Sequence, residues 1–83
     1  MGPMTAQSLL ETIEQITREK QESRRYPEYA LSIEILRRCP GLTELRLNQI
    51  AKELIDSGRV IKRDTLNYDA YQITTPNAQG LGD

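Results

Sequence analysis

The chain changes from a helical to an extended pattern within one short stretch, LIDSGRVI at residues 54–61. Apolar residues before Gly58 recur at helical spacing, whereas those after it are adjacent and β-branched, as in a strand. Because glycine readily takes the left-handed conformation that ends many helices, Gly58 predicts a helix end. Thr43 suits an N-cap, so a helix is expected over residues 44–57. Its buried side is expected to hold Leu47, Ile50, Ala51 and Leu54.

The residues after Gly58 predict a β-hairpin. Residues 59–63, RVIKR, are β-branched at their centre, and residues 64–67, DTLN, are rich in turn formers. Residues 68–73, YDAYQI, return as a second strand with Tyr71 and Ile73 on one face. The sheet expected from the sequence is therefore two-stranded.

An amphipathic helix is expected near the start of the chain, over about residues 7–24. Ser8 and Glu11 have the spacing of a capping box. Apolar residues then follow at three- and four-residue steps: Leu9, Leu10, Ile13 and Ile16. The charged residues between them, including Lys20, are expected on the solvated side of this helix.

A second helix is expected over about residues 28–38, with no strand before it. Tyr26 precedes a proline, which disfavours helical backbone and ends the first helix, and Pro27 suits the first turn of the next. Residues 1–6 and 74–83 have little to bury and are expected to be disordered, which leaves one domain over residues 7–73.

The composition argues against catalysis. The chain of 83 residues has no histidine and one cysteine, so the commonest general base is missing and neither a disulfide nor a cysteine metal cluster is available. Neither a glycine-rich phosphate loop nor a long apolar run is found. We expect a cytoplasmic protein that is not an enzyme, has no cofactor or metal, and takes no small-molecule substrate or membrane as a partner.

The net charge of −1 hides an uneven distribution. Between Arg37 and Arg63 there are seven basic and three acidic residues, which makes this segment +4 and leaves −5 for the rest. The segment predicts a domain with one basic side, provided that the fold gathers these residues on one face.

The order of three helices and a hairpin, with the junction LIDSGRVI and the strand YDAYQI, resembles a winged helix-turn-helix domain. The resemblance covers about residues 8–73 and implies an α+β, mostly helical fold: a three-helix winged helix-turn-helix with a C-terminal two-stranded β-hairpin wing. It also implies that the third helix enters the major groove of duplex DNA while the hairpin, or wing, contacts the backbone or minor groove. The function expected on this basis is DNA binding by a small transcriptional or mobile-element regulator.

The resemblance implies three groups of DNA-binding residues. The candidates for base edges lie on the outer side of the third helix, where asparagine and glutamine suit adenine and arginine suits guanine; they are Arg46, Asn48, Gln49 and Lys52. The wing candidates are Lys62, Arg63 and Thr65. Phosphate contacts are expected from Arg59 and from the pair Arg37 and Arg38.

Two alternatives remain open from the sequence. The same fold could serve as a winged-helix protein–protein interaction module, which a patchwork surface with exposed Leu45, Leu66 and Tyr68 would favour over one continuous basic face. A homodimer could form through Leu10 and Ile13 of the first helix, although a core of this size needs both residues.

Overall fold

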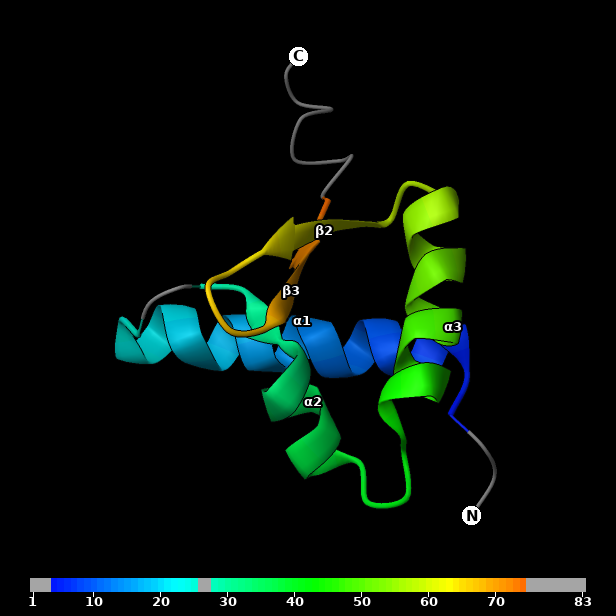
Figure 1. Ribbon diagram of the computed structural model, residues 1–83. Helices are drawn as coiled ribbons and strands as arrows, with labels where there is room; N and C mark the ends of the chain where they lie inside the picture. The colour runs from blue at the N-terminus through cyan, green and yellow to red at the C-terminus, as the bar shows by residue number, and fades with distance from the viewer. Residues whose placement is uncertain (1–3, 26–27, 75–83) are drawn as a thin grey trace.

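The computed structural model describes residues 4–25 and 28–74, which form one layer of helices against one face of a sheet (Figure 1). The elements are α1 (Ala6–Ser23), β1 (Ala30–Leu31), α2 (Ser32–Arg38), α3 (Glu44–Asp56), β2 (Val60–Asp64) and β3 (Asp69–Ile73). The strands form an antiparallel sheet in the order β1-β3-β2. The α+β class with three helices and a C-terminal hairpin is confirmed.

The sheet has three strands rather than the two that were expected. β1 pairs Ala30 with Tyr71 and Leu31 with Ala70, on the side of β3 away from β2. A strand of two residues carries no alternating pattern, so its pairing with a distant strand defines it. The second helix accordingly begins at Ser32 and not at residue 28, and Pro27 lies outside the described residues.

The first helix begins earlier than the capping-box spacing indicated. Thr5 is the N-cap, and its hydroxyl oxygen accepts a hydrogen bond from the Ser8 backbone N–H at 3.1 Å. Ser8 therefore lies in the first turn and is not the cap. At the other end, Arg24 takes a left-handed conformation with φ 56°, and the Arg25 N–H donates back to the Lys20 carbonyl at 2.9 Å. This geometry ends the helix without a glycine.

Lys20, which was expected on the solvated side of the first helix, is only 4% exposed. Its ammonium lies 2.7 Å from Glu34 Oε1 and donates to the Tyr29 carbonyl at 2.9 Å. The same Glu34 oxygen accepts the Leu31 backbone N–H at 2.9 Å, at the start of α2. The methylene stem of lysine can lie along apolar surface, so a charged residue near a helix end can be buried where a carboxylate reaches its head group.

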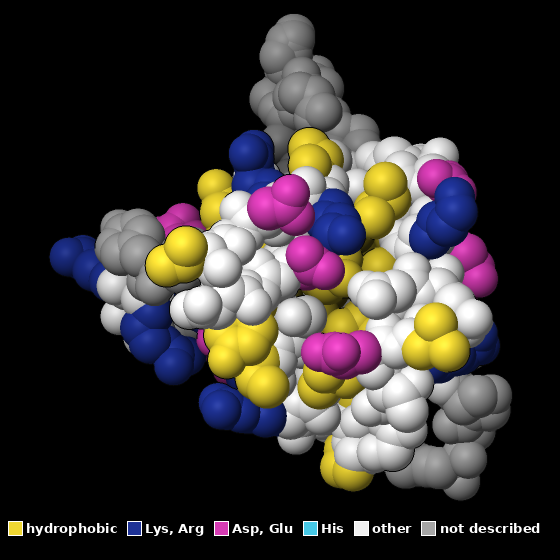
Figure 2. Space-filling view, viewed as in Figure 1, with side chains coloured by type: hydrophobic (Ala, Val, Ile, Leu, Met, Phe, Trp, Pro, Cys, Tyr) yellow, Lys and Arg dark blue, Asp and Glu magenta, His cyan; other side chains and the backbone are white. Residues whose placement is uncertain are grey.

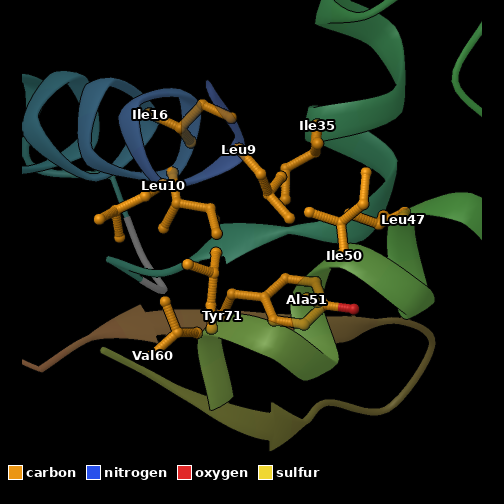
Figure 3. Packing of buried hydrophobic residues seen from close by; sticks show 12 residues of the cluster. Leu9, Leu10, Ile16, Ile35, Leu47, Ile50, Ala51, Val60 and Tyr71 are labelled. Atoms are coloured by element: carbon orange, nitrogen blue, oxygen red, sulfur yellow. The ribbon is translucent and has the colours of Figure 1, made fainter. Parts of the chain in front are cut away.

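The hydrophobic core lies between the helices and the sheet, as Figure 3 shows for the side chains of α1, α2 and α3 above the strands. The largest fully buried side chains are Tyr71, Leu9, Ile13, Ile35, Leu47, Ile50 and Val60. Leu10 and Ile13 are part of this core, so neither is exposed for pairing with a second copy.

The junction of α3 and β2 forms as the sequence predicts. The Thr43 side chain accepts the Arg46 backbone N–H at 3.1 Å, which confirms the N-cap. Gly58 has φ +78°, its N–H donates to the Ile55 carbonyl at 3.0 Å, and the next N–H donates to the Leu54 carbonyl at 2.9 Å. This pair of bonds is a Schellman motif, which turns the chain directly from helix into strand.

Candidate nucleic-acid interface

The outer side of α3 holds the four candidates for base contact. The period of the helix buries Leu47, Ile50, Ala51 and Leu54 against the core. All four polar candidates are consequently exposed: Arg46, Asn48, Gln49 and Lys52. The structure thus brings this group together on one helix face, and its role in binding DNA stays a prediction.

Three of the four side chains interact with others on the same helix. The Lys52 ammonium lies 3.1 Å from Asp56 Oδ2, one turn further along α3. Arg46 Nη1 donates to Gln49 Oε1 at 3.4 Å, a long hydrogen bond. The charge of Lys52 is therefore partly balanced before any ligand arrives.

Asn48 is connected to the core through Tyr71. The buried Tyr71 hydroxyl donates to Asn48 Oδ1 at 3.3 Å. Burial, together with the nearby charge of Asp69, raises the pKa of Tyr71 to about 12, so the hydroxyl keeps its proton at neutral pH. Because a buried hydroxyl proton needs an acceptor, Asn48 turns its oxygen inward and its amino group outward.

The hairpin divides its basic residues between two faces. Side chains alternate along a strand, and Val60 points into the core, so Lys62 lies on the helix side of the sheet. Its ammonium is 3.5 Å from Asp69 Oδ2. Arg59 and Arg63 fall on the opposite face of the sheet, so the wing candidates do not form one group.

Thr65 has a structural part in the hairpin turn. Its hydroxyl oxygen accepts the Tyr68 backbone N–H at 3.0 Å, and its own N–H donates to the Tyr68 carbonyl at 3.0 Å. The side chain also contacts that carbonyl oxygen. These bonds close the turn and leave the hydroxyl already engaged.

Arg37 and Arg38 lie at the end of α2. Since α2 starts directly after β1, its C-terminal end points away from the sheet and the hairpin (Figure 1). Arg38 forms a two-pronged contact with the Glu19 carboxylate of α1. The hydrogen bond from Arg38, aided by one from Gln15, lowers the pKa of Glu19 to about 2. Arg38 therefore joins α2 to α1, while Arg37 is exposed.

The charges of α3 and the hairpin balance. Five basic residues, Arg46, Lys52, Arg59, Lys62 and Arg63, are matched by five acidic ones, Glu44, Glu53, Asp56, Asp64 and Asp69. The basic segment read from the sequence ended at Arg63, but the hairpin returns Asp64 and Asp69 beside it. Figure 2 shows the basic side chains of this view in separate groups, with acidic side chains between them.

Large apolar side chains are exposed near the same elements. Leu45 in the first turn of α3 is 69% exposed, and Leu66 and Tyr68 in the hairpin turn are 96% and 44% exposed. A hollow of about 240 Å³ lies beside this turn, lined mainly by Glu44, Ser32 and residues 65–69. This patchwork of charges and apolar residues is the surface expected above for a winged-helix protein–protein interaction module.

Within residues 4–25 and 28–74 no group of three His, Cys, Asp or Glu side chains could hold a metal ion. Among the helices described, none has the length and apolar character needed to cross a membrane. Comparison of the chain with protein-family models, with curated proteins and with solved structures finds no match.

Proposed function

We propose that this protein is a winged-helix module that binds duplex DNA, with α3 in the major groove and the β2–β3 hairpin as the wing. The observation that carries the proposal is the position of α3. Its row of polar side chains is exposed, and the hairpin begins directly after its glycine cap at Gly58. Such a module would regulate transcription or a mobile element by occupying its site, without chemistry.

The order of the elements supports this proposal beyond what the sequence pattern offered. The winged-helix family has a strand between its first two helices, and β1 lies at that position. It pairs with β3, so the hairpin is anchored to the helical part by a third strand. This anchoring would hold the wing at a fixed distance from α3.

The side chains of α3 suggest which DNA groups they would contact. Arg46 suits the two acceptors of guanine, and Gln49 beside it suits adenine. Asn48 would need both its oxygen and its amino group for the two-bond contact with adenine, but its oxygen accepts from Tyr71. We therefore expect Asn48 to donate to an acceptor such as guanine O6, thymine O4 or a phosphate oxygen, which differs from the adenine contact expected from the sequence.

The balanced charge predicts modest affinity. Lys52 and Lys62 must leave Asp56 and Asp69 to reach phosphates, and the nearby carboxylates repel the backbone. With two or three phosphates neutralised, log K should fall with log salt with a slope of about −2 to −3. Fluorescence anisotropy with a randomised duplex over a salt series measures this slope, and a value near zero would contradict the proposal.

A titration of the ¹⁵N-labelled protein with the same duplex would map the surface. Amide shifts should concentrate in α3 and the hairpin, and the paired change Arg46→Glu with Lys52→Glu should abolish binding while the fold is kept. Arg25→Glu, at an exposed position just after α1, is the control and should change affinity less than twofold. Shifts confined to α1 would reject α3 as the reading helix.

A second candidate function is favoured by the exposed apolar residues. If α3 and the hairpin bind a protein instead of DNA, Leu45, Leu66 and Tyr68 would be buried in that contact. Replacing Leu66 and Tyr68 with serine separates the two functions. If the protein binds DNA, the duplex affinity of this variant should stay within twofold of the wild type. If it is a protein-interaction module, the wild type itself should not bind the duplex.

A further inference from the structure

The face of the sheet opposite the helices carries a row of three side chains from β2 and the residue before it. Alternation along the strand places Arg59, Ile61 and Arg63 on this face, because Val60 between them is buried in the core. All three are exposed, and Ile61 is 44% exposed. We call these three residues the open-face row. It presents an apolar centre between two positive charges.

The two arginines of the open-face row are among the cations of the described residues that form no ion pair. Lys20, Arg38, Lys52 and Lys62 each have a carboxylate within 4.0 Å. No carboxylate among the described residues lies that close to Arg59 or Arg63, so their charges have no partner in this part of the chain. An anionic ligand could therefore bind them without first breaking an internal ion pair.

Arg63 is held in position by its neighbours. Its Nε donates to Gln72 Oε1 at 2.6 Å, and its guanidinium carbon lies 5.6 Å from the centre of the Tyr29 ring. The two terminal amino groups of Arg63 make no hydrogen bond to the described residues, and these are the groups that bind a carboxylate side by side. A fixed guanidinium loses little conformational entropy when it binds an anion.

β2 is also an edge strand. It pairs with β3 along one side only, and residues 61–64 are exposed. The backbone N–H and C=O groups on its other side are available to a further strand. Strand addition supplies main-chain hydrogen bonds, and side chains two residues apart then face the same side of the sheet.

We propose that an extended acidic peptide binds along the free edge of β2 and places its alternate side chains beside the open-face row. Two carboxylates four residues apart would lie opposite Arg59 and Arg63, with an apolar residue midway beside Ile61. The recognised pattern is acidic, any residue, apolar, any residue, acidic. This inference goes beyond DNA binding, because the row lies on the face of the sheet opposite Lys62 and the helices.

A peptide fits this row better than a DNA backbone does. Two phosphates could bind the arginines, but a phosphodiester offers no apolar group for Ile61 and no N–H donor for the strand edge. A peptide strand supplies both, together with carboxylates at the spacing of the arginines. Positive residues on an edge strand also discourage pairing with a second copy of the same strand.

The probe is a blocked nonapeptide with Glu-Thr-Val-Thr-Glu at its centre, titrated into the ¹⁵N-labelled full chain. Amide shifts should concentrate at residues 59–64, with saturation at high micromolar to millimolar peptide. A peptide with both glutamates replaced by lysine should not bind. A peptide N-methylated at alternate residues, prepared in both frames, should lose binding in one frame, because only one set of N–H groups faces β2.

Matched variants test the row itself. Arg59→Glu and Arg63→Glu should each lower the affinity for the peptide at least tenfold. Lys62→Glu, in the same strand but on the opposite face, should change this affinity less than twofold. Arg59→Glu is the cleaner variant, since Arg63 also contacts Tyr29 and Gln72. Unchanged shifts of Tyr71 and Ala70 would verify that the sheet is intact.

The outcome is independent of DNA binding by α3. Peptide binding without duplex binding would support this inference and reject the proposed function. Three results would overturn the inference. The first is absence of peptide binding, and the second is a loss of peptide affinity in Lys62→Glu equal to that in Arg59→Glu. The third is a loss of duplex affinity in Arg59→Glu as large as that in Lys52→Glu. The last result would show that the open-face row contacts phosphates.

Discussion

In the half of the molecule built from α1, β1 and α2, ion pairs join one helix to the other, whereas in the half built from α3 and the hairpin they form inside the helix or inside the hairpin. Lys20 of α1 reaches Glu34 of α2, and Arg38 of α2 reaches Glu19 of α1. In the second half, Lys52 pairs with Asp56 inside α3, and Lys62 of β2 pairs with Asp69 of β3 inside the hairpin. Both halves contribute to the apolar core, so the first is distinguished by electrostatic contacts between its helices and the second by its glycine cap.

The largest effect is expected from breaking the buried contact of the first half. Lys20→Met keeps the apolar stem but leaves Glu34 without its cation and the Tyr29 carbonyl without its donor, which should lower the free energy of unfolding by about 3 kcal/mol. Chemical denaturation followed by circular dichroism measures this loss. Lys52→Met removes an exposed pair and should cost less than about 0.5 kcal/mol. Equal losses in the two variants would show that the two halves do not differ in this way.

A smaller loss is expected at the glycine cap of the second half. Apart from Gly58 and its two chain neighbours, no residue has an atom within 4 Å of the position of a Cβ at Gly58, so the cost of a side chain there comes from the backbone, at φ +78°. Gly58→Ala should lower the free energy of unfolding by about 1–2 kcal/mol. Gly58→Asn should lose less, because asparagine tolerates the left-handed region better. A loss that does not depend on which residue replaces Gly58 would point to contacts rather than to backbone strain.

In the first half, the left-handed conformation of Arg24 predicts that glycine at this position would stabilise the fold. Arg24 is in the left-handed region with φ 56° and has no glycine to relieve the strain. Arg24→Gly should raise the free energy of unfolding by about 0.5–1 kcal/mol, since it removes this strain at some entropic cost in the unfolded chain. Thermal unfolding at fixed pH measures the gain, with Arg25→Gly as the control that should not stabilise. A lower melting temperature for Arg24→Gly would contradict this account of the helix end.

The smallest effect is expected from Glu19, and it is present at neutral pH and fades in acid. The pKa of Glu19 is lowered from 4.5 to about 2 by the hydrogen bond from Arg38. A carboxyl with a depressed pKa stabilises the fold fully above its unfolded pKa, and this stabilisation is lost as the pH falls from about 4.5 towards 2. The melting temperature of Glu19→Gln should therefore fall less over that range than the melting temperature of the wild type. Parallel pH profiles of the two proteins would reject the linkage.

The difference between the halves also explains what could be predicted from the sequence. The sequence features that predict the second half are local. Thr43 and Gly58 lie at the two ends of α3, and the buried residues between them follow the helical period. The features that define the first half are distant in sequence. β1 exists because Ala30 pairs with Tyr71, and Lys20 is buried because Glu34 lies beside it in space. Neither contact leaves a pattern within a short window of residues.

The candidate interface was predictable in part for the same reason. The exposure of Arg46 and Asn48 follows from the helical period, which is a local property. The hydrogen bond from Tyr71 to Asn48 spans 23 positions and could not be read from spacing. The pairing of Lys62 with Asp69 was predictable, because the expected hairpin places its two strands side by side. The basic segment was defined only as far as Arg63, so it did not include Asp69.

The place of β3 in the sheet has a consequence for how the chain acquires its structure. It is the last of the three strands along the sequence, yet it lies in the middle, and β1 and β2 meet only through it. During synthesis the earlier strands emerge with no partner to pair with, and their edges stay open until Ile73 has left the ribosome. Closure of the sheet is then a single late event, and a nascent chain that stalls before this residue presents two unprotected edges to chaperones and proteases.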